Sequence, residues 1–155
     1  MPKIEFLCGA PLSGKSTYAR ERNKRFSYSI LSRDNIRVVI NNGKYPKGYN
    51  RTLEEAVTKI SDIRLSTLLI YRRDICIDNT NTNPKYIRQI INKLPPDYEW
   101  SIIFFDISLL KAYYRNIIRY ILGREKKWIP IKVIKKFIRE YKSFKRSYED
   151  GLIEF

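Results

Sequence analysis

The chain has 155 residues, of which 43% are hydrophobic and 30% are charged, so we expect one soluble globular domain and not a disordered tail. Its 31 Lys and Arg residues outnumber its 16 Asp and Glu residues, and the resulting net charge of +15 favours a polyanionic partner, either nucleic acid or, less often, an anionic membrane surface. The chain has no histidine, which excludes Ser-His-Asp triads, imidazole general bases and His-ligated zinc sites.

Strands and helices alternate along the sequence. We expect strands at residues 3–8, 28–32, 74–78 and 100–107, and helices at about 15–24, 34–41, 51–72, 84–94, 109–122 and 130–147. Asn83-Pro84 is a strong helix start, with Asn as the N-cap and Pro at the first position. The alternation predicts an α/β fold with a four- or five-stranded parallel sheet flanked by helices, in a single domain over residues 1–155. In such sheets the ligand site lies beyond the carboxyl ends of the strands, so the turns after Cys8, Ser32 and Ile77 should meet.

The turn after the first strand carries a nucleotide-binding motif. It has the sequence Gly9-Ala10-Pro11-Leu12-Ser13-Gly14-Lys15-Ser16-Thr17. This fits G-x-x-x-x-G-K-[ST] in full, between a strand and a helix as the motif requires, and a chance match at average residue usage is rare. The backbone N–H groups and the helix N-terminus suit phosphate oxygens. Lys15 can reach the β- and γ-phosphates of ATP, and the Ser16 hydroxyl can ligate Mg²⁺.

The turn after the second strand, Ser32-Arg33-Asp34-Asn35-Ile36-Arg37, suggests an acceptor site. Beside an ATP γ-phosphate, the carboxylate of Asp34 can take a proton from a hydroxyl and Arg37 can hold the acceptor's own phosphate. The alternative is structural: Asp34 caps the next helix and Arg37 is a surface residue. Arg37 fits that alternative less well, because a cation in the first helical turn opposes the macrodipole.

The motifs, in their order, resemble a known family. GAPLSGKSTYAR, SRDNIR, DNTNTNP and RN–R–GREKKWIP are similar to the kinase domain of bacteriophage 5′-hydroxyl polynucleotide kinase, from residue 1 to about residue 145. Many NTPases share the phosphate loop, whereas R-D-x-x-R after the second strand together with T-N-x-N-P after the third is more specific. The resemblance implies a P-loop kinase fold, ATP and Mg²⁺ as cofactors, and transfer of the γ-phosphate to 5′-hydroxyl ends of DNA or RNA.

The resemblance also implies roles for individual residues. Lys15 and Ser16 would serve the phosphates and the metal, Asp34 would be the general base, and Arg37 would bind the 3′ phosphate of the acceptor. Asp34 is in addition a candidate metal contact. Because the chain ends before a second catalytic domain could begin, only kinase activity is implied.

One position departs from the family pattern. The family has an acidic residue just before T-N-x-N-P, where this chain has Asn79. Either Asn79, followed by Thr80, supplies the acceptor contact without charge, or the adjacent Asp78 takes its place. Asp78 is also placed like the carboxylate that helps to hold Mg²⁺ in other phosphate-loop enzymes. The plain alternative for Asn79, Thr80 and Asn81 is turn chemistry.

The C-terminal part of the chain is strongly basic. Residues 111–146 contain 13 Lys or Arg residues and only two acids, and the apolar stripe of the last predicted helix leaves its cations on the other side. A charged face can simply solvate an amphipathic helix, but such faces usually mix both signs, so we favour a surface for a polyanion.

The basic segment also contains the arginines of a lid-like stretch. In the family an arginine closes over the transferred phosphoryl group; counting forward from Arg115-Asn116 selects Arg119, and counting back from Pro130 selects Arg124. Together these charges would stabilise the transferred group, and Arg115 is a further candidate ATP ligand. The loop aromatics Tyr45, Tyr49 and Trp128 either stack on bases or pack against their own domain.

The sequence thus predicts a P-loop kinase of polynucleotide 5′-hydroxyl ends. A kinase of the same fold with another acceptor (a nucleoside or nucleotide, a modified DNA base or a small-molecule hydroxyl) and a nucleic-acid-binding ATPase module are the alternatives. Cys8 and Cys76 in apolar runs, without any membrane span or signal peptide, favour a cytoplasmic protein with no membrane partner. The abundant Ile, Lys, Asn and Tyr are compatible with a viral gene, and a viral protein of this kind would be located in the host cytoplasm. A homo-oligomer is compatible with the sequence.

Overall fold

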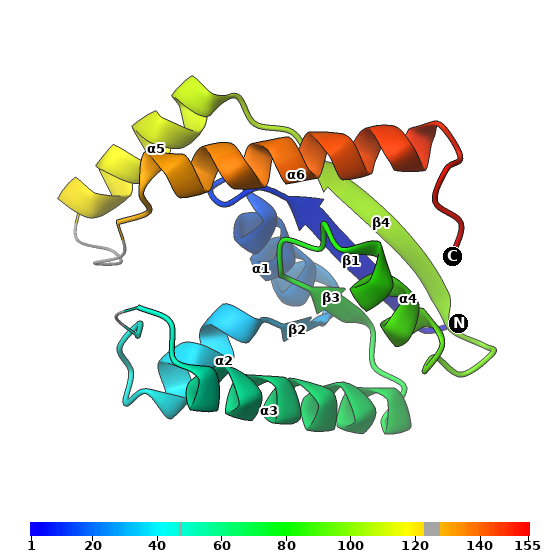
Figure 1. The fold of residues 1–155 in the computed structure, drawn as a ribbon. Coiled ribbons are helices and arrows are strands. Elements are labelled where there is room, and N and C mark those ends of the chain that lie inside the picture. The colour runs from blue at the N-terminus through cyan, green and yellow to red at the C-terminus, as the bar shows by residue number, and fades with distance from the viewer. Residues whose placement is uncertain (47, 123–127) are drawn as a thin grey trace.

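A parallel sheet forms the centre of the molecule in a computed structural model, which describes residues 1–46, 48–122 and 128–155 (Figure 1). The strands are β1 (Lys3–Gly9), β2 (Ser29–Leu31), β3 (Ile75–Ile77) and β4 (Glu99–Phe105). They pair in parallel in the order β2-β3-β1-β4, and the last residue of β1, Gly9, lies opposite Phe105 of β4. The predicted α/β fold is confirmed, with four strands in the described part of the chain.

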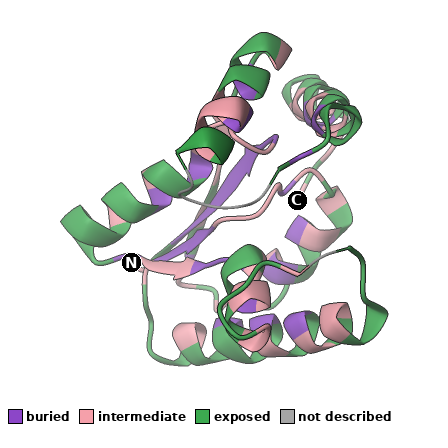
Figure 2. Ribbon diagram, turned by 90° about the vertical axis from the view of Figure 1, so that its left-hand side faces the viewer, coloured by how far each residue is buried: buried purple, intermediate pink, exposed green. Residues whose placement is uncertain are grey.

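Helices cover both faces of this sheet. They are α1 (Lys15–Phe26), α2 (Arg33–Ile40), α3 (Arg51–Ile70), α4 (Pro84–Ile91), α5 (Leu109–Ile121) and α6 (Ile131–Glu149). Alternate residues of β1 point to opposite faces: Ile4 and Phe6 join the larger apolar cluster with α2, α3, α4 and α6, whereas Leu7 packs with Ala19 of α1. The helices keep their exposed residues on the outside, β1 and β3 are almost wholly buried, and most residues of β2 and β4 are of intermediate exposure (Figure 2).

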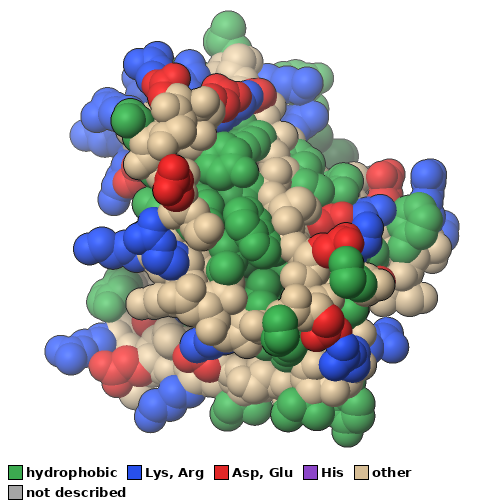
Figure 3. All heavy atoms as spheres, turned by 90° about the vertical axis from the view of Figure 1, so that its right-hand side faces the viewer, with side chains coloured by type: hydrophobic (Ala, Val, Ile, Leu, Met, Phe, Trp, Pro, Cys, Tyr) green, Lys and Arg blue, Asp and Glu red, His purple; other side chains and the backbone are tan. Residues whose placement is uncertain are grey.

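Two further features complete the frame. A third apolar cluster joins Ala10 of the phosphate loop to Ala112 of α5 and Ile134 of α6, so the loop is anchored to the C-terminal helices. The face that carries both chain ends gathers hydrophobic side chains along its middle, with charged side chains at its margins (Figure 3). In the described ranges no helix combines the length and the apolar character that crossing a membrane requires.

A buried ion pair fastens α1 beneath β1. The Glu5 side chain is 6% exposed, and it pairs with Arg22 of α1 and accepts a hydrogen bond from the Tyr18 hydroxyl at 3.2 Å. The Arg22 guanidinium lies 4.4 Å from the centre of the Tyr28 ring and also donates to the Tyr28 hydroxyl at 2.9 Å. The hydrogen bond to Glu5 raises the pKa of Arg22, which favours the charged form of the guanidinium.

Several predicted boundaries are shifted by one to three residues, and two of these shifts have a clear local cause. The helix expected over 84–94 ends at Ile91. The N–H groups of Lys93 and Leu94 bond to carbonyls three residues back instead of four, and Pro95 cannot continue a helix. The strand expected over 100–107 ends at Phe105, because its partner β1 ends at Gly9 and offers no further backbone groups.

Candidate active site

The phosphate loop runs between β1 and α1 and depends on two glycines. A Cβ atom at Gly9 would lie 2.8 Å from Ser13 Oγ and 2.9 Å from the Phe105 carbonyl oxygen, which is too close for any side chain. Gly14, the N-cap of α1, has φ +107°, a conformation that L side chains rarely adopt. Leu12 also takes a left-handed conformation, with φ 70°. The loop therefore curls tightly enough to turn its backbone toward a phosphate.

Lys15 folds back over this loop. Its Nζ donates hydrogen bonds to the carbonyl oxygens of Gly9 at 2.8 Å and Ala10 at 2.7 Å, and to Ser13 Oγ at 3.3 Å. Burial lowers the pKa of Lys15 to about 8, against the opposing pull of the nearby Asp78 and Asp34 carboxylates. Lys15 is therefore the cation at the centre of the loop, and Asp34 and Asp78 lie close enough to act on its charge.

Asp78 and Ser16 form the part of the site that could hold a metal. Asp78 follows β3, and its carboxylate lies beside the Ser16 side chain; burial raises the pKa of Asp78, and the Ser16 contact and Lys15 oppose that rise. Among the described residues, no group of three or more His, Cys, Asp or Glu side chains could hold a metal ion. One hydroxyl and one carboxylate nevertheless suit Mg²⁺, which keeps several waters and takes its other ligands from phosphates.

The residues after Asp78 serve mainly as a scaffold. Asn79 Oδ1 accepts a hydrogen bond from the backbone N–H of Arg33 at 3.1 Å, and the Thr80 carbonyl accepts one from Gly9 N at 3.0 Å. The amide of Asn81, which is 3% exposed, donates to the Leu7 and Ile77 carbonyls at 3.0 and 2.8 Å. Asp78 and Asn79 point in different directions, since the first turns to Ser16 of α1 and the second to the start of α2.

Ser32, and not Asp34, caps α2. The helix begins at Arg33, and the Ser32 hydroxyl accepts a hydrogen bond from Asn35 N at 3.4 Å. Arg37 then lies in the last turn of this eight-residue helix, so the expectation that it opposes the macrodipole from the first turn is wrong. Both side chains are thus available for the site: the Asp34 side chain is 54% exposed and that of Arg37 is 19% exposed.

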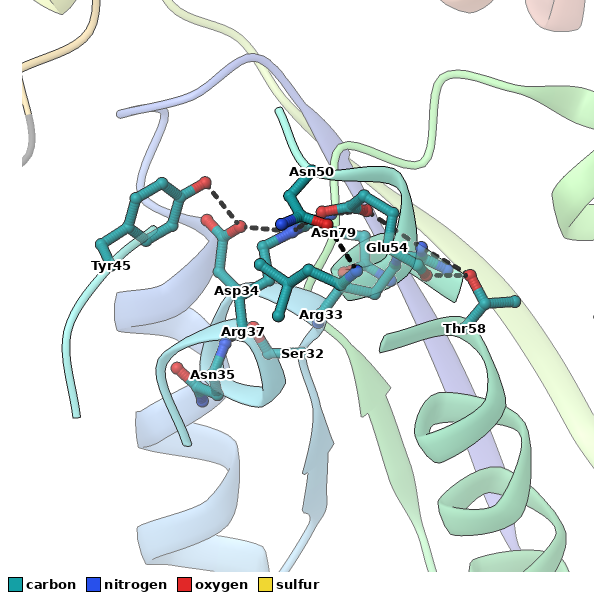
Figure 4. A network of polar contacts seen from close by, with 11 residues as sticks. Ser32, Arg33, Asp34, Asn35, Arg37, Tyr45, Asn50, Glu54, Thr58 and Asn79 are labelled. Atoms are coloured by element: carbon teal, nitrogen blue, oxygen red, sulfur yellow. Dashed lines mark hydrogen bonds and ion pairs between the residues drawn. The ribbon is translucent and has the colours of Figure 1, made fainter. Parts of the chain in front are cut away.

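Arg37 is the centre of a cluster of charges (Figure 4). Its Nη1 donates to Asp34 Oδ1 at 2.6 Å, while Nε and Nη2 donate to the two oxygens of Glu54 at 2.6 and 2.9 Å. Arg33 also reaches Glu54, at 3.4 Å, and the Tyr45 hydroxyl donates to Asp34 Oδ1 at 3.4 Å. The hydrogen bonds with Glu54 raise the pKa of Arg37, and those with Arg37 lower the pKa of Glu54. Both shifts favour the charged forms of Arg37 and Glu54.

No pattern in the sequence indicated that Glu54 belongs to the site. It lies in the first turn of α3, where an acidic residue is ordinary because it suits the helix N-terminus, and no motif includes it. The contact between Glu54 and Arg37 becomes apparent only when α3 packs against α2. A hollow of about 370 Å³ beside Glu54 is lined by Tyr49 and Thr58, and one of about 250 Å³ lies beyond Arg33.

Helix α5 approaches the phosphate loop from the side opposite to α2. Arg115 Nη1 donates to the Leu12 carbonyl at 2.8 Å, and Arg119, half-buried, lies one turn further along the same face of the helix. Arg124, the other candidate for the lid arginine, lies outside the described residues. The structure thus brings Arg115 to the loop, and it leaves the choice between Arg119 and Arg124 as a prediction.

A buried amide fixes the chain that follows the lid stretch. The fully buried Asn116 donates from Nδ2 to the Ile129 carbonyl at 2.8 Å, and it accepts a hydrogen bond from Ile129 N at 3.3 Å. The neighbouring Trp128 meets the rings of Tyr113 and Tyr120 edge-on, with centroid distances of 6.4 and 5.7 Å. Trp128 therefore packs on its own domain while 44% of it stays exposed.

Three comparisons relate this chain to known proteins. The profile of a family described as AAA domain matches residues 5–144, and no curated protein sequence matches the chain. A chain in the structure of the Pnkp1/Rnl/Hen1 RNA repair complex is similar to it with a TM-score of 0.81 and 26% identity, over 94% of this chain and 46% of that one. This chain therefore spans less than half the length of that relative.

Two small-molecule kinases share the fold at lower identity. A gluconokinase from Sinorhizobium meliloti 1021 matches with a TM-score of 0.57 and 14% identity, over 90% of this chain and 74% of that one. The APS kinase CysC from Mycobacterium tuberculosis matches with a TM-score of 0.52 and 17% identity, over 79% and 75%. At these identities the likeness concerns the fold alone.

Proposed function

The chain belongs to the AAA-domain family, with the fold of P-loop kinases, and on this basis we propose that it is an ATP-dependent kinase of polynucleotide 5′-hydroxyl ends. One observation carries the choice of acceptor. The Asp34–Arg37 ion pair lies close enough to Lys15 for Asp34 to influence its pKa. A carboxylate suited to accept a proton and a cation suited to bind a phosphate would thus lie side by side near the loop that would present the γ-phosphate.

Two further findings support a polynucleotide as the acceptor. The relative with 26% identity belongs to a complex whose function is RNA repair, and the match covers 94% of this chain. The net charge of +15 suits an acceptor with many phosphates, whereas a kinase of free nucleotides has little use for it. The gluconokinase and APS kinase relatives, which share only the fold, do not favour a second function.

The proposed reaction assigns one task to each side chain. The 5′-hydroxyl oxygen of the acceptor attacks the γ-phosphorus, its proton goes to Asp34, and the bond to the bridging oxygen breaks, so that ADP leaves. Arg37 holds the 3′ phosphate of the acceptor nucleotide, which positions the hydroxyl for in-line attack. When ATP binds, Lys15 Nζ gives up its hydrogen bonds to the loop oxygens and donates instead to the β- and γ-phosphates. Arg115 and Arg119 bring positive charge to the α5 side of the transferred group.

The residues present fit a magnesium ion at the edge of the phosphate loop. Ser16 and Asp78 would hold it, because their side chains already meet there and burial raises the pKa of Asp78, a cost that a cation offsets. When bound, such an ion neutralises charge on the phosphates and orients them. Asp34, whose Oδ1 accepts hydrogen bonds from Arg37 and Tyr45, is better placed for the acceptor than for the metal.

Transfer of label from [γ-³²P]ATP tests the proposal directly. We expect label on the 5′ end of single-stranded DNA or RNA with a 5′-hydroxyl, and none on nucleosides, gluconate or adenosine phosphosulfate offered separately. Label confined to one of the small molecules would show a kinase with another acceptor. Hydrolysis of ATP without transfer to any acceptor would show an ATPase module.

A variant separates the general base from the rest of the site. Asp34→Asn should lower kcat by about 10²–10⁴-fold, as expected for loss of a general base, with ATP binding nearly unchanged. Asp62→Asn, which removes an exposed carboxylate on α3, is the matched control and should retain full activity. Full kcat in Asp34→Asn would remove Asp34 from the reaction.

A further inference from the structure

The outer side of α6 carries a line of cations that the proposed reaction does not use. The helix buries Ile134, Tyr141 and Phe144 against the rest of the protein. Its opposite side carries six exposed cations, namely Lys132, Lys135, Lys136, Arg139, Lys142 and Arg146. Spacings of one to four residues place all six within an arc of about 120° on an α-helix, so they form one continuous stripe, here called the α6 stripe.

Within the described residues, most of the α6 stripe has no carboxylate in ion-pair contact. Among the described residues only Lys136 has a carboxylate partner, Glu140, at 3.8 Å. The other cations of this part of the chain behave differently: Arg115 donates to the phosphate loop, and Lys145 pairs with Asp106 at 2.6 Å. Like charges three or four residues apart weaken a helix by about 0.2–0.5 kcal/mol per pair. The stripe therefore costs stability, and a bound polyanion would remove that cost.

We propose that the α6 stripe binds the sugar–phosphate backbone of a nucleic acid outside the acceptor site. From Lys132 to Arg146 the helix rises about 21 Å at 1.5 Å per residue. At 3.4 Å of helix axis per phosphate of one strand, this length corresponds to about six phosphates, one for each cation of the stripe. A membrane-surface helix inserts its apolar side into lipid, whereas α6 packs its apolar side against β1 and α5, so nucleic acid is the partner that fits.

The stripe starts close to the phosphate loop. Ile134, in the first turn of α6, packs in one cluster with Ala10 of that loop, and α6 begins at the end of the molecule where the loop lies (Figure 1). A strand whose 5′ end sits in the acceptor site can therefore continue onto α6. In this last step the inference rests on the proposed function, because it identifies the bound nucleic acid with the acceptor strand.

Two variants with equal loss of charge test the stripe. Lys135→Ala, Arg139→Ala and Lys142→Ala, combined, remove three of its cations; Lys24→Ala, Lys59→Ala and Arg64→Ala, combined, remove three exposed cations from α1 and α3. The probe is a fluorescent, 5′-phosphorylated single strand, which binds but cannot accept phosphate. For the stripe variant we expect the slope of log K against log salt to become shallower by about 2, at 0.7 per phosphate contact. The control variant should keep the wild-type slope.

The outcomes separate this inference from the proposed function. Equal slopes for the two variants would overturn it, and so would stripe-dependent binding to phosphatidylserine vesicles with unchanged binding to the strand. A stripe-dependent slope in a protein that labels no 5′-hydroxyl end would support the stripe and refute the proposed function. Transfer to oligonucleotides with a stripe-independent slope would do the reverse. Transfer to a 3′-mononucleotide should be equal in both variants, since it reaches the acceptor site alone.

Discussion

Arg37, the residue proposed to hold the acceptor phosphate, is itself held by two carboxylates. Glu54 takes its Nε and one donor of Nη2, and Asp34 takes one donor of Nη1. Of the five N–H donors of a guanidinium, one on each Nη then remains, and a phosphate can accept both in a bidentate contact. Glu54 therefore fixes the plane of Arg37 without occupying the edge that a phosphate would use, which makes it a positioning residue.

Removing the charge of Glu54 should weaken the acceptor site. We expect Glu54→Gln to raise KM for a 3′-phosphorylated acceptor by about ten- to a hundredfold, since a charge-assisted contact contributes roughly 1.5–3 kcal/mol, and to change kcat much less. Glu55→Gln is the control, because Glu55 is exposed and pairs with Arg51 at 3.0 Å. Steady-state kinetics over acceptor concentration gives both constants. A lower KM in Glu54→Gln would show instead that Glu54 competes with the acceptor for Arg37.

Lys15 should couple nucleotide binding to proton uptake. Its pKa is about 8 because it is buried, and phosphate oxygens beside the ammonium would raise this pKa toward or above its ordinary value. Binding at pH 8 should therefore take up about half a proton, and binding at pH 9 close to one, while affinity falls as the pH rises above 8. Calorimetric titration with ATP in buffers of different ionisation enthalpy measures this number. No uptake at either pH would show that Lys15 is fully charged before nucleotide binds.

At the residue scale, the sequence predicted what lies within a motif and missed what spans elements. The phosphate-loop contacts of Lys15 are local, within six residues, so the motif implies them. Glu54 lies 17 residues from Arg37, across a loop and on another helix, and only packing brings them together. Asn79 is a second example. The sequence suggested an acceptor contact or a role in a turn, but not the hydrogen bond that Asn79 accepts from the backbone N–H of Arg33.

At the scale of elements, the hydrophobic pattern predicted the order and type of every helix and strand in the described part of the chain. Ends set by side-chain chemistry were also predicted, such as the Asn83 cap with Pro84 at the start of α4. Ends set by a partner were not: β2 has only three residues because it pairs along β3 alone, which is equally short. The choice of Ser32 over Asp34 as the cap of α2 depends on where the neighbouring strand stops, so the sequence left it open.

The link between α1 and β1 should depend on the charge of Arg22. Arg22→Met would leave the buried Glu5 carboxylate without its cation, and we expect a loss of about 3–5 kcal/mol in the free energy of unfolding. Arg25→Met, at an exposed position of the same helix, should change it by less than about 0.5 kcal/mol. Urea unfolding followed by circular dichroism measures both variants. Equal stabilities would mean that α1 is held by its apolar contacts alone.

At the scale of the whole molecule, positive charge is unevenly distributed. The acceptor cluster is balanced, since Arg33 and Arg37 face Asp34 and Glu54, and the buried pair Glu5–Arg22 is neutral. Much of the surplus lies instead on the outside of α6, where only one of the six cations has a carboxylate partner among the described residues. Repulsion among these cations should lower the stability of the folded state, so stability alone does not account for their presence on one face of α6.

The response of stability to salt should therefore run opposite to that of a protein held by surface ion pairs. Added chloride shortens the range of repulsion between the cations, so Tm should rise with NaCl until the Debye length falls below their spacing. Each kcal/mol gained raises Tm by about 2–4 °C at this chain length. The combined Lys135→Ala, Arg139→Ala and Lys142→Ala variant should have a higher Tm than the wild type at low salt, and its Tm should rise less with NaCl.

The combined Lys24→Ala, Lys59→Ala and Arg64→Ala control has the same net charge as the α6 variant, so it separates the repulsion on α6 from the effect of the overall charge. Scanning calorimetry of the three proteins across a chloride series measures the effect. A Tm that falls with salt, or two variants that respond alike, would show that the α6 stripe is not a source of strain.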